Sequence, residues 1–550
     1  MGLKQADGLA PLHVACMQGR VECIAVLLDH GANVNDTTDV GFNALDVACQ
    51  VDQVECARLL LERGASIWRV TAAGMYPLQV ACVYGSVNCV KLLIEKGAPP
   101  GQEKEHHVTT LHIACGNNRV ECARVLMEAG VPVDVRDLFG KTALHIACQT
   151  GAVDCAHLLL ESGADASTGC NNQASPLYVA CENGNATCAK LLLEQAGVFV
   201  DERKMHGETP LYIACRGGHV ECARLVLDKG AVVDAEDIYG VTALHIACWA
   251  GKVACAQLLL ERGASAEKPA GGSRMPLHTV AEKGDVPVCR LLLAHGVSVD
   301  PRLENGATPL HIACENDAAP CVELLLSKGA DLEAFMVNGF SPLHVACQHG
   351  FVTVATILLD AGAVVDQHDQ DLSTPLHIAC GSAQLECARL LLKRGADPNA
   401  ANKFGMAPLH VAAAANHDNC IRLLLDQGAQ VDQGTNRERT PLHIACQEGH
   451  ATCVRMLLDA GASTKRRSRD RDTPLTAACR NSHRECVYLL LQAGADIHAP
   501  GPRGMSPRWC AEEEGTPDPE LAQVLQKIEE DPDMSLSHWD MNLLQMQAEG

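Results

Sequence analysis

The stretch Thr308-Pro309-Leu310-His311-Ile312-Ala313-Cys314 decides the fold, because similar stretches recur along the whole chain. Proline suits the first turn of a helix, and a threonine just before it can cap that helix. Leu310, Ala313 and Cys314 have helical spacing, which places them on one face. We therefore expect a short helix here. The same leucine anchors fifteen units: Leu12, Leu45, Leu78, Leu111, Leu144, Leu177, Leu211, Leu244, Leu277, Leu310, Leu343, Leu376, Leu409, Leu442 and Leu475.

The anchor leucines are 33 residues apart, except for one step of 34 that holds an extra residue at Gln195-Ala196. Each opening is followed by a turn, often with glycine, and then by a second apolar stretch such as Cys453 to Leu458. Nearly every second stretch ends in Gly-Ala, and glycine favours the left-handed end of a helix. Each unit is therefore predicted to be a pair of helices followed by a turn.

This period and the Thr-Pro-Leu-His opening closely resemble the ankyrin repeat. The resemblance covers residues 6–500 and implies an all-α fold, an ankyrin-repeat solenoid of helix pairs with short β-hairpin or turn connections. One unit cannot bury its own apolar face, so neighbouring units stack on a continuous core. Five openings lack the histidine, and we expect them to lose the hydrogen bond that it makes: Asp46, Gln79, Tyr178, Tyr212 and Thr476 stand in its place.

Three regions are predicted along the chain. Residues 6–500 form the array of fifteen repeats, residues 501–530 form a degenerate sixteenth repeat or C-terminal cap, and residues 531–550 form a flexible tail. The apolar residues of the second region have the helical spacing that a capping helix needs: Leu521, Val524, Leu525 and Ile528.

Composition excludes several classes of protein. The net charge is −23, from 44 basic and 67 acidic residues, and this excess repels nucleic acid. No apolar run approaches the roughly 18 residues of a membrane-spanning helix, so we expect no membrane insertion. The stretch from Met1 to Asp7 lacks the apolar segment of a secretory signal. Cationic protein surfaces are therefore the more natural partners of this acidic chain.

The chain has 29 cysteines, and 26 of them occupy two fixed slots, one in each helix of the unit. We interpret these cysteines as small hydrophobic core residues, because Ala413, Val354 and Glu282 stand where cysteine is missing. Buried free thiols fit a reducing compartment, which predicts the cytoplasm or the nucleus. Cys170 and Cys510 fall outside the slots and are expected to be more reactive.

Neither metal binding nor catalysis is predicted. His-x-x-Cys recurs, as in His13 with Cys16, but a slot repeated in so many units fits a structural role better than a zinc site. The chain contains no phosphate-binding loop, nucleophile elbow, metalloprotease motif or kinase motif set. We therefore expect no enzyme activity, no catalytic residue and no cofactor.

Ankyrin-like arrays bind proteins through their hairpin tips and the concave face of their first helices, and the resemblance implies the same use here. The residues after the first-helix cysteine vary between units, and aromatic and arginine side chains dominate interface hot spots. These aromatics, Trp249 included, have an alternative role, which is packing on a neighbouring part of the array. The predicted partner-binding residues, with Trp249 near the centre, are Tyr84, Phe139, Arg216, Tyr239, Trp249 and Phe404.

The segment Lys465-Arg466-Arg467-Ser468-Arg469-Asp470-Arg471 is a basic island in an acidic protein. Such a run is more often a solvated hairpin loop, and a nuclear-localisation or anion-binding patch is the alternative.

Two functions are consistent with these features. The first is a non-catalytic scaffold or adaptor that binds partner proteins. The alternative is a substrate receptor of a cullin-type ubiquitin ligase, because the Cys-rich repeats are similar to those of the ankyrin repeat and SOCS box family. The stretch Ser535 to Leu544 would be a degenerate box, with Asp540 where that family has cysteine and only six residues after Leu544. Elongin and cullin are expected partners only under this alternative.

Overall fold

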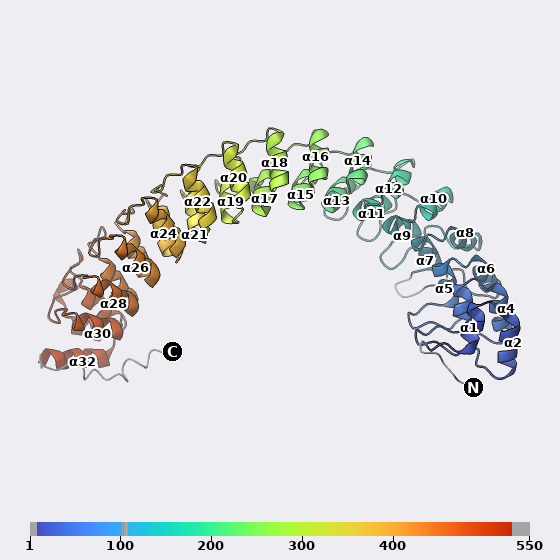
Figure 1. The fold of residues 1–550 in the computed structure, drawn as a ribbon, viewed down its shortest axis with the longest axis horizontal. Helices are drawn as coiled ribbons and strands as arrows, with labels where there is room; N and C mark the ends of the chain where they lie inside the picture. The colour runs from blue at the N-terminus through green and yellow to red at the C-terminus, as the bar shows by residue number, and fades with distance from the viewer. Residues whose placement is uncertain (1–7, 102, 104–107, 531–550) are drawn as a thin grey trace. The chain divides into compact units, whose positions relative to one another are not determined.

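The structure, a computed structural model, describes residues 8–101, 103 and 108–530. The chain divides into two compact units, one ending at Gly271 and the other beginning at Gly272. Each unit is a row of helix pairs (Figure 1). The predicted all-α fold of helix pairs is therefore confirmed. Among the described residues, β pairing occurs only as isolated bridges, such as Thr37 with Asn43 and Glu103 with Thr109.

The first unit contains eight helix pairs in the described residues. Its helices are α1 Pro11–Met17, α2 Val21–Asp29, α3 Ala44–Gln50, α4 Val54–Glu62, α5 Pro77–Tyr84, α6 Val87–Glu95, α7 Thr110–Gly116, α8 Val120–Glu128, α9 Ala143–Thr150, α10 Val153–Glu161, α11 Pro176–Asn183, α12 Ala186–Leu193, α13 Pro210–Gly217, α14 Val220–Asp228, α15 Ala243–Trp249 and α16 Val253–Glu261.

The second unit has the same plan and adds a final pair of different length. Its α-helices are α17 Pro276–Lys283, α18 Val286–Ala294, α19 Pro309–Glu315, α20 Ala319–Ser327, α21 Pro342–His349, α22 Val352–Asp360, α23 Pro375–Gly381, α24 Leu385–Lys393, α25 Pro408–Ala414, α26 Asp418–Asp426, α27 Pro441–Glu448, α28 Ala451–Asp459, α29 Pro474–Arg480, α30 Arg484–Gln492, α31 Pro507–Glu513 and α32 Pro519–Glu530. Two short 3-10 helices accompany them, η2 Gly271–Ser273 and η3 Pro502–Gly504.

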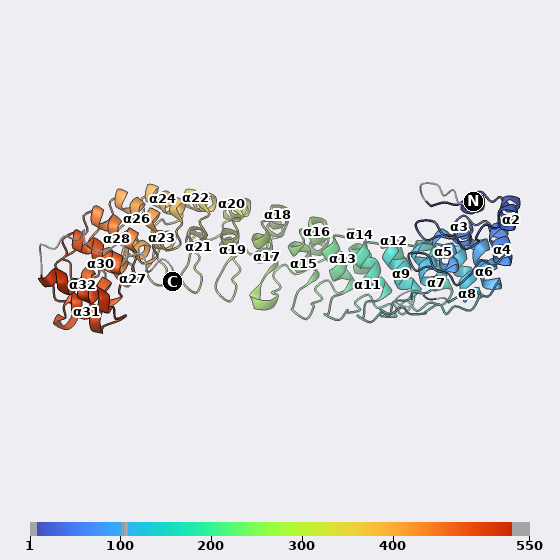
Figure 2. The same cartoon turned by 90° about the horizontal axis from the view of Figure 1, so that it is seen from below.

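Within each unit the odd-numbered first helices pack in one layer and the even-numbered second helices pack in another. The loop before each first helix forms a hairpin, and these hairpins project from the side of the first helices (Figure 2). Neighbouring hairpin tips are joined by single backbone hydrogen bonds, such as Asn436 N–H to the Phe404 carbonyl (3.0 Å). Gly405 has φ +75°, and a Cβ there would lie 2.4 Å from the Asn436 nitrogen. The close approach of the next hairpin therefore requires glycine at this position.

The opening histidine caps the N-terminus of its helix. Thr308 has extended backbone, Pro309 begins α19, and Nδ1 of His311 accepts a hydrogen bond from the Thr308 backbone N–H (3.2 Å). Because Nδ1 is an acceptor, the proton of the neutral ring is on Nε2. Nε2 then donates to the Phe340 carbonyl (3.0 Å), which lies 29 residues further on, in the next hairpin.

This bridge recurs along the chain, and it requires a neutral ring. The equivalent acceptors are the carbonyls of Lys141, Ala174, Ser373, Met406, Arg439 and Asp472, bound by His112, His145, His344, His377, His410 and His443. Burial lowers the pKa of His311 to about 4. The ring therefore stays uncharged at neutral pH and can keep one acceptor and one donor nitrogen.

Three of the five repeats that lack this histidine keep the bond at the helix start through Asp46, Gln79 or Thr476. Asp46 Oδ2 accepts from the Asn43 N–H (3.0 Å), and Gln79 Oε1 accepts from the Tyr76 N–H (3.1 Å). Asp46 is fully buried, and its second oxygen, Oδ1, has no hydrogen-bond partner among the described residues. Burial raises the pKa of Asp46 to about 7.

A second ladder joins many of the repeats through side chains, mostly aspartates, in the turn after the second helix. Asp432 accepts a hydrogen bond from the Ser463 backbone N–H, 31 residues further on (3.0 Å). The same bond, across the same number of residues, is made by Asp134, Asp201, Asp234, Asp300, Asp366 and Asn399. The ladder therefore holds each of these turns against the next one, at a different place in the repeat from the histidine bridges.

All 29 cysteines are free thiols in the structure, and the slot cysteines lie in the core, with one exception. The second-helix thiol lies against the first helix of the preceding repeat, as Cys89 Sγ does against the Ala48 carbonyl (3.7 Å). Cys23 is exposed because its helix, α2, belongs to the first repeat, and no helix precedes that repeat in the described residues.

Three expectations about cysteine need correction. Ala281, not Glu282, occupies the vacant first-helix slot, since Ala281 is buried while Glu282 is partly exposed and pairs with Arg274. Cys289 is a third cysteine outside the slots, because Val288 fills the slot in α18. Cys170 is buried and its Sγ donates to Asn172 Oδ1 (2.7 Å), and Cys510 is buried too. Their positions outside the slots therefore do not expose them.

We expect Asp46→Asn to stabilise the first unit above neutral pH. A carboxyl with a raised pKa contributes stability at low pH, and this contribution is lost as the pH rises through about 7. One pKa unit corresponds to about 1.4 kcal/mol, so the gain at pH 8 should be roughly 2–4 kcal/mol. Urea unfolding followed by circular dichroism at pH 5 and pH 8 measures it. Exposed Asp39→Asn is the control, and equal gains at the two pH values would contradict the assignment.

We expect Cys23 to be the first thiol to be alkylated in the native protein. Cys23 is exposed, whereas Cys170 is buried and hydrogen-bonded. Limited treatment with iodoacetamide and peptide mapping would rank the two. Modification of Cys170 as fast as Cys23 would show that its hairpin opens readily.

Candidate functional site

The residues predicted for partner binding fall on one kind of surface, the C-terminal ends of the first helices together with the hairpins before them. We call this the first-helix face. Tyr84 is the last residue of α5 and Trp249 is the last residue of α15, with 42% and 53% of their surface exposed. Both side chains therefore lie where a partner could reach them.

The three hairpin aromatics are also exposed. Phe139, Tyr239 and Phe404 keep 56%, 66% and 54% of their surface exposed, so their rings do not bury themselves on a neighbouring hairpin. Their backbone carbonyls instead accept hydrogen bonds from the next hairpin, as Phe139 does from Asn171 N–H (3.0 Å). Tyr239 and Trp249 belong to one repeat, and Phe404 belongs to the second unit.

Arg216 lies in a polar cluster that the sequence did not reveal. Its guanidinium approaches Glu208 (3.5 Å) and Glu182 (3.9 Å), while Tyr178 donates its hydroxyl to Glu208 (3.2 Å). Lys204 Nζ lies 5.0 Å from the centre of the Tyr178 ring. Arg216 is therefore held within the chain rather than being a bare contact residue.

The phenols in this cluster remain protonated. Burial, and then the charge of Glu208, raise the pKa of Tyr178 above its usual value. Burial raises the pKa of Tyr212 to about 12. Both tyrosines replace the opening histidine in successive repeats, and that replacement was the signal by which the cluster could have been found.

The first unit also has an apolar hollow on this face, about 510 Å³ in volume. Val83, Ile113 and Ile146 contribute to its wall, and Gly116 forms part of its floor. The other repeats of the first unit carry a side chain at the Gly116 position, and a Cβ there would lie 2.9 Å from Ile146 Cγ2. The missing side chain therefore helps to create the hollow.

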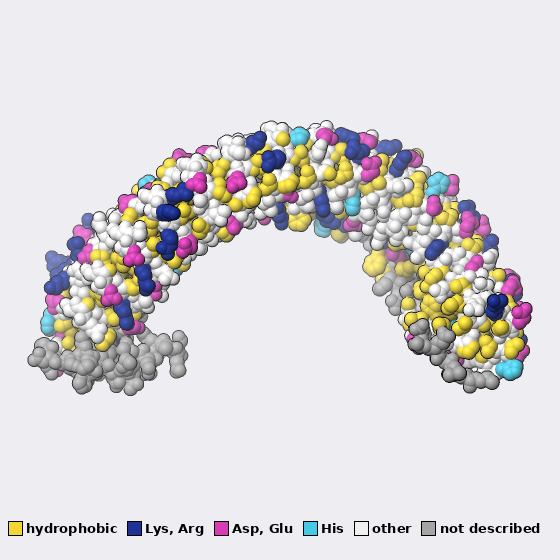
Figure 3. Space-filling view, in the orientation of Figure 1, with side chains coloured by type: hydrophobic (Ala, Val, Ile, Leu, Met, Phe, Trp, Pro, Cys, Tyr) yellow, Lys and Arg dark blue, Asp and Glu magenta, His cyan; other side chains and the backbone are white. Residues whose placement is uncertain are grey.

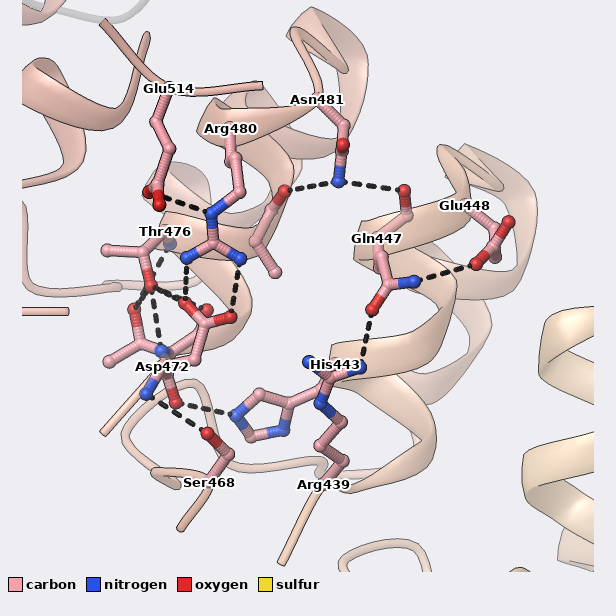
Figure 4. A network of polar contacts seen from close by, with 12 residues as sticks. Arg439, His443, Gln447, Glu448, Ser468, Asp472, Thr476, Arg480, Asn481 and Glu514 are labelled. Atoms are coloured by element: carbon pink, nitrogen blue, oxygen red, sulfur yellow. Dashed lines mark hydrogen bonds and ion pairs between the residues drawn. The ribbon is translucent and has the colours of Figure 1, made fainter. Parts of the chain in front are cut away.

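A network of polar contacts ties the fifteenth repeat to Glu514, which comes directly after α31. Figure 4 shows the Arg480 guanidinium held between Asp472 and Glu514. Arg480 Nη1 lies 2.9 Å from Asp472 Oδ2, and Nε lies 3.0 Å from Glu514 Oε2. Asp472 also accepts through its carbonyl from His443 Nε2 (3.1 Å), so this histidine bridge belongs to the same network.

A second ion pair lies beside α32. Arg484 contacts both carboxylate oxygens of Asp518, at 2.6 and 2.7 Å, and both side chains are largely buried. Burial alone would raise the pKa of Asp518, but Arg484 and the backbone N–H of Leu521 hold it below its usual value. Leu521 and Leu525 are buried, so α32 packs through an apolar face as well.

Neither a metal cluster nor a membrane span is found in the part of the chain that the structure describes. No group of three or more His, Cys, Asp or Glu side chains is arranged to hold a metal ion there. No helix among those residues is long and apolar enough to cross a membrane. The segment Ser535 to Leu544, which the ligase alternative depends on, lies outside the described residues.

The repeats also match a known family in sequence. The family described as ankyrin repeats (3 copies) matches residues 1–71, 69–137, 129–204, 197–270, 267–336, 333–402 and 397–468. A single ankyrin repeat matches residues 470–502. The chain belongs to the ankyrin-repeat family. Its repeats are therefore of a kind that serves generally for binding between proteins.

Among solved structures, this ankyrin-repeat protein is similar to the crystal structure of the ankyrin repeat domain of Bcl-3, described as a unique member of the IkappaB protein family. The two are 31% identical, the similarity covers 40% of this chain and 98% of that chain, and the TM-score is 0.36. No curated protein sequence matches the chain.

We expect Arg484→Met to loosen α32. The substitution keeps the aliphatic part of the side chain but removes the charge-assisted hydrogen bonds to Asp518 and Glu520, each worth roughly 1.5–3 kcal/mol. Backbone amides of α32 should then exchange hydrogen faster, while those of α27 stay unchanged. Hydrogen exchange with mass spectrometry measures both. Exposed Arg389→Met is the control, and unchanged exchange in α32 would mean that its apolar face alone holds it.

Proposed function

We propose that this protein is a non-catalytic scaffold or adaptor that binds partner proteins along the first-helix face and the hairpin tips. The observation that carries the proposal is the exposure of Trp249 and Tyr239 in one repeat of an otherwise aromatic-poor chain. Exposed aromatic side chains contribute much binding energy at interfaces and little to the stability of the free protein. The apolar hollow beside Val83 adds a second contact area in the same unit.

The partner-binding role extends to the cluster around Arg216. Its guanidinium is held at 3.5 Å from Glu208, which fixes its position before a partner arrives. A fixed side chain loses less conformational entropy on binding than a free one. We therefore propose that Arg216, Tyr84 and Phe139 contribute polar and aromatic contacts in the same unit as Trp249, and that Phe404 contributes a separate contact on the first-helix face of the second unit.

We propose further that the protein works in a reducing compartment, the cytoplasm or the nucleus. All 29 of its cysteines are free, and nearly all are buried in positions that small apolar residues fill in other repeats. Such thiols persist where the surroundings are reducing.

We expect Trp249→Ala to weaken capture of the partner and to leave the melting temperature nearly unchanged. Truncation of a hot-spot tryptophan costs about 2 kcal/mol or more, which is roughly 30-fold in affinity. Affinity purification with quantitative mass spectrometry would identify the partners and measure their loss. Trp68→Ala, another exposed tryptophan of the same unit, is the matched control.

Two results would contradict the proposal. Trp249 is a packing residue if its variant loses several kcal/mol of stability while capture stays intact after correction. Recovery of elongins with the wild-type chain would favour the alternative, a substrate receptor of a cullin ubiquitin ligase.

A further inference from the structure

The ladder of acidic side chains gives way to a basic residue at one turn of the second unit. Asp432 accepts from the Ser463 N–H, but Lys465 stands where the next repeat should carry the acceptor. The backbone N–H that this acceptor would receive is that of Asp496, 31 residues further on, and it makes no hydrogen bond within the described residues. Glu333 makes no ladder bond either, but it keeps a carboxylate at its turn. With Lys465 at this position, the Asp496 N–H has no ladder carboxylate to bind.

A neighbouring arginine has lost its usual partner as well. Arg136, Arg203 and Arg302 occupy one position of the repeat, and each donates to the carbonyl of the residue 33 positions further on, such as Phe335 for Arg302 (2.9 Å). Arg467 occupies the same position but makes no such bond, nor any ion pair, in the described residues. Its guanidinium is exposed and available.

These two departures meet at one pocket. A cavity of about 450 Å³ is lined by Lys465, Arg467, Gly494, Ala495 and Asp496, among other residues. The backbone donor and the two basic side chains therefore surround the space where the ladder elsewhere places a carboxylate. The carboxylate of Asp496 is no obstacle, because Asp165, Asp331 and Asp397 are acidic too and still receive the ladder carboxylate at their backbone N–H.

The surface around the pocket is basic. Lys465, Arg466, Arg467, Arg469 and Arg471 are exposed on one hairpin, and Arg437 is exposed on the hairpin before it. The two hairpins are adjacent, since Arg469 N–H donates to the Arg437 carbonyl (2.8 Å). Figure 3 shows Lys and Arg side chains gathered at the left edge of the view, near the end of the second unit.

Basic side chains elsewhere in the chain are commonly neutralised by an acidic neighbour. Arg63, Arg262 and Arg394 pair with aspartates of the preceding repeat at 2.6 to 2.9 Å. On the basic hairpin only Arg466 approaches a carboxylate of the described residues, Asp432, at 3.9 Å. Clustered like charges repel one another, so this arrangement has no folding benefit.

We propose that this pocket and its basic rim bind an acidic segment of a partner protein, with one carboxylate of that segment taking the place of the missing ladder aspartate. The carboxylate would accept from the Asp496 N–H and from Lys465 and Arg467. Arginine forks on the rim suit the other planar carboxylates of such a segment. This inference rests on the proposed protein-binding function and adds the chemistry of one partner segment and the place where it binds.

Other anionic partners fit the surface less well. Residues 431–473 contain no Phe, Tyr or Trp on which a nucleobase could stack. They also expose no large apolar side chain that could enter a lipid surface. The basic run is folded into its hairpin, where Ser468 N–H bonds to the Asp472 carbonyl (2.8 Å), so it is not an extended signal for an import receptor.

The decisive variant is Lys465→Asp, which restores the ladder carboxylate and fills the site from within. The full-length protein is titrated into a fluorescein-labelled octaglutamate peptide, and binding is followed by fluorescence anisotropy at low salt and at physiological salt. We expect Lys465→Asp and Arg467→Glu to weaken binding roughly tenfold or more, as expected for lost charge-assisted hydrogen bonds. Lys465→Asp should not lower the melting temperature, because it satisfies the Asp496 N–H.

The control is Arg422→Asp, which changes the net charge equally at an exposed position on α26. Arg422→Asp should retain binding of the peptide. Trp249→Ala should retain it too, so a failure of the acidic-peptide site can be told apart from a failure of the proposed first-helix face. Equal binding by Lys465→Asp and wild type, or equal loss in Arg422→Asp, would overturn the site. Tighter binding of single-stranded DNA or phosphatidylserine vesicles through the same residues would overturn the choice of an acidic peptide.

Discussion

In most repeats the register of the array depends on a buried, neutral histidine that joins one repeat to the next. One ring meets two needs, because it receives a backbone N–H that the start of a helix leaves unpaired and donates to a carbonyl 29 residues away, as His311 does between Thr308 and Phe340. A charged ring would lose its acceptor, so burial that keeps the ring neutral is part of the structure. The bond also sets the distance between a helix start and the following hairpin. The remaining elements of a repeat are positioned relative to this bond.

The helix pairs could be predicted from the sequence because their determinants are local. Proline at a helix start, glycine at its end and apolar residues at helical spacing act within a few residues, and the period of 33 multiplies the signal. Bonds between repeats were harder to foresee, since the partners of Asp432 or His311 lie about 30 residues away. In one repeat the cysteine pattern points one position too far along the chain. Ala281, not Glu282, fills the slot in α17, and Val288, not Cys289, fills the slot in α18.

The exposure of the candidate binding residues could be predicted from their positions in the repeat, whereas their polar contacts could not. Trp249 and Tyr239 stand at positions that the core does not use, and both are exposed. The setting of Arg216 needs Tyr178 and Glu182 from α11 together with Glu208 from the hairpin before α13, so it depends on how two neighbouring repeats pack. The burial of Cys170 is hidden from the sequence for a related reason. A hairpin lies at the surface, but the thiol of Cys170 faces inward and bonds to Asn172.

A repeat array makes departures from its own pattern informative, because each position has many counterparts that show what folding alone requires. A departure costs stability unless something else uses it, and Asp46 and Lys465 illustrate two outcomes. Asp46 leaves one oxygen without a partner among the described residues, at a fully buried place that solvent does not reach, so its effect stays within the fold. Lys465 removes an acceptor beside an open cavity, and Arg467, freed in the same turn, lines that cavity. Two losses that converge on one accessible space are better explained by a ligand that supplies the missing carboxylate than by drift at two separate positions.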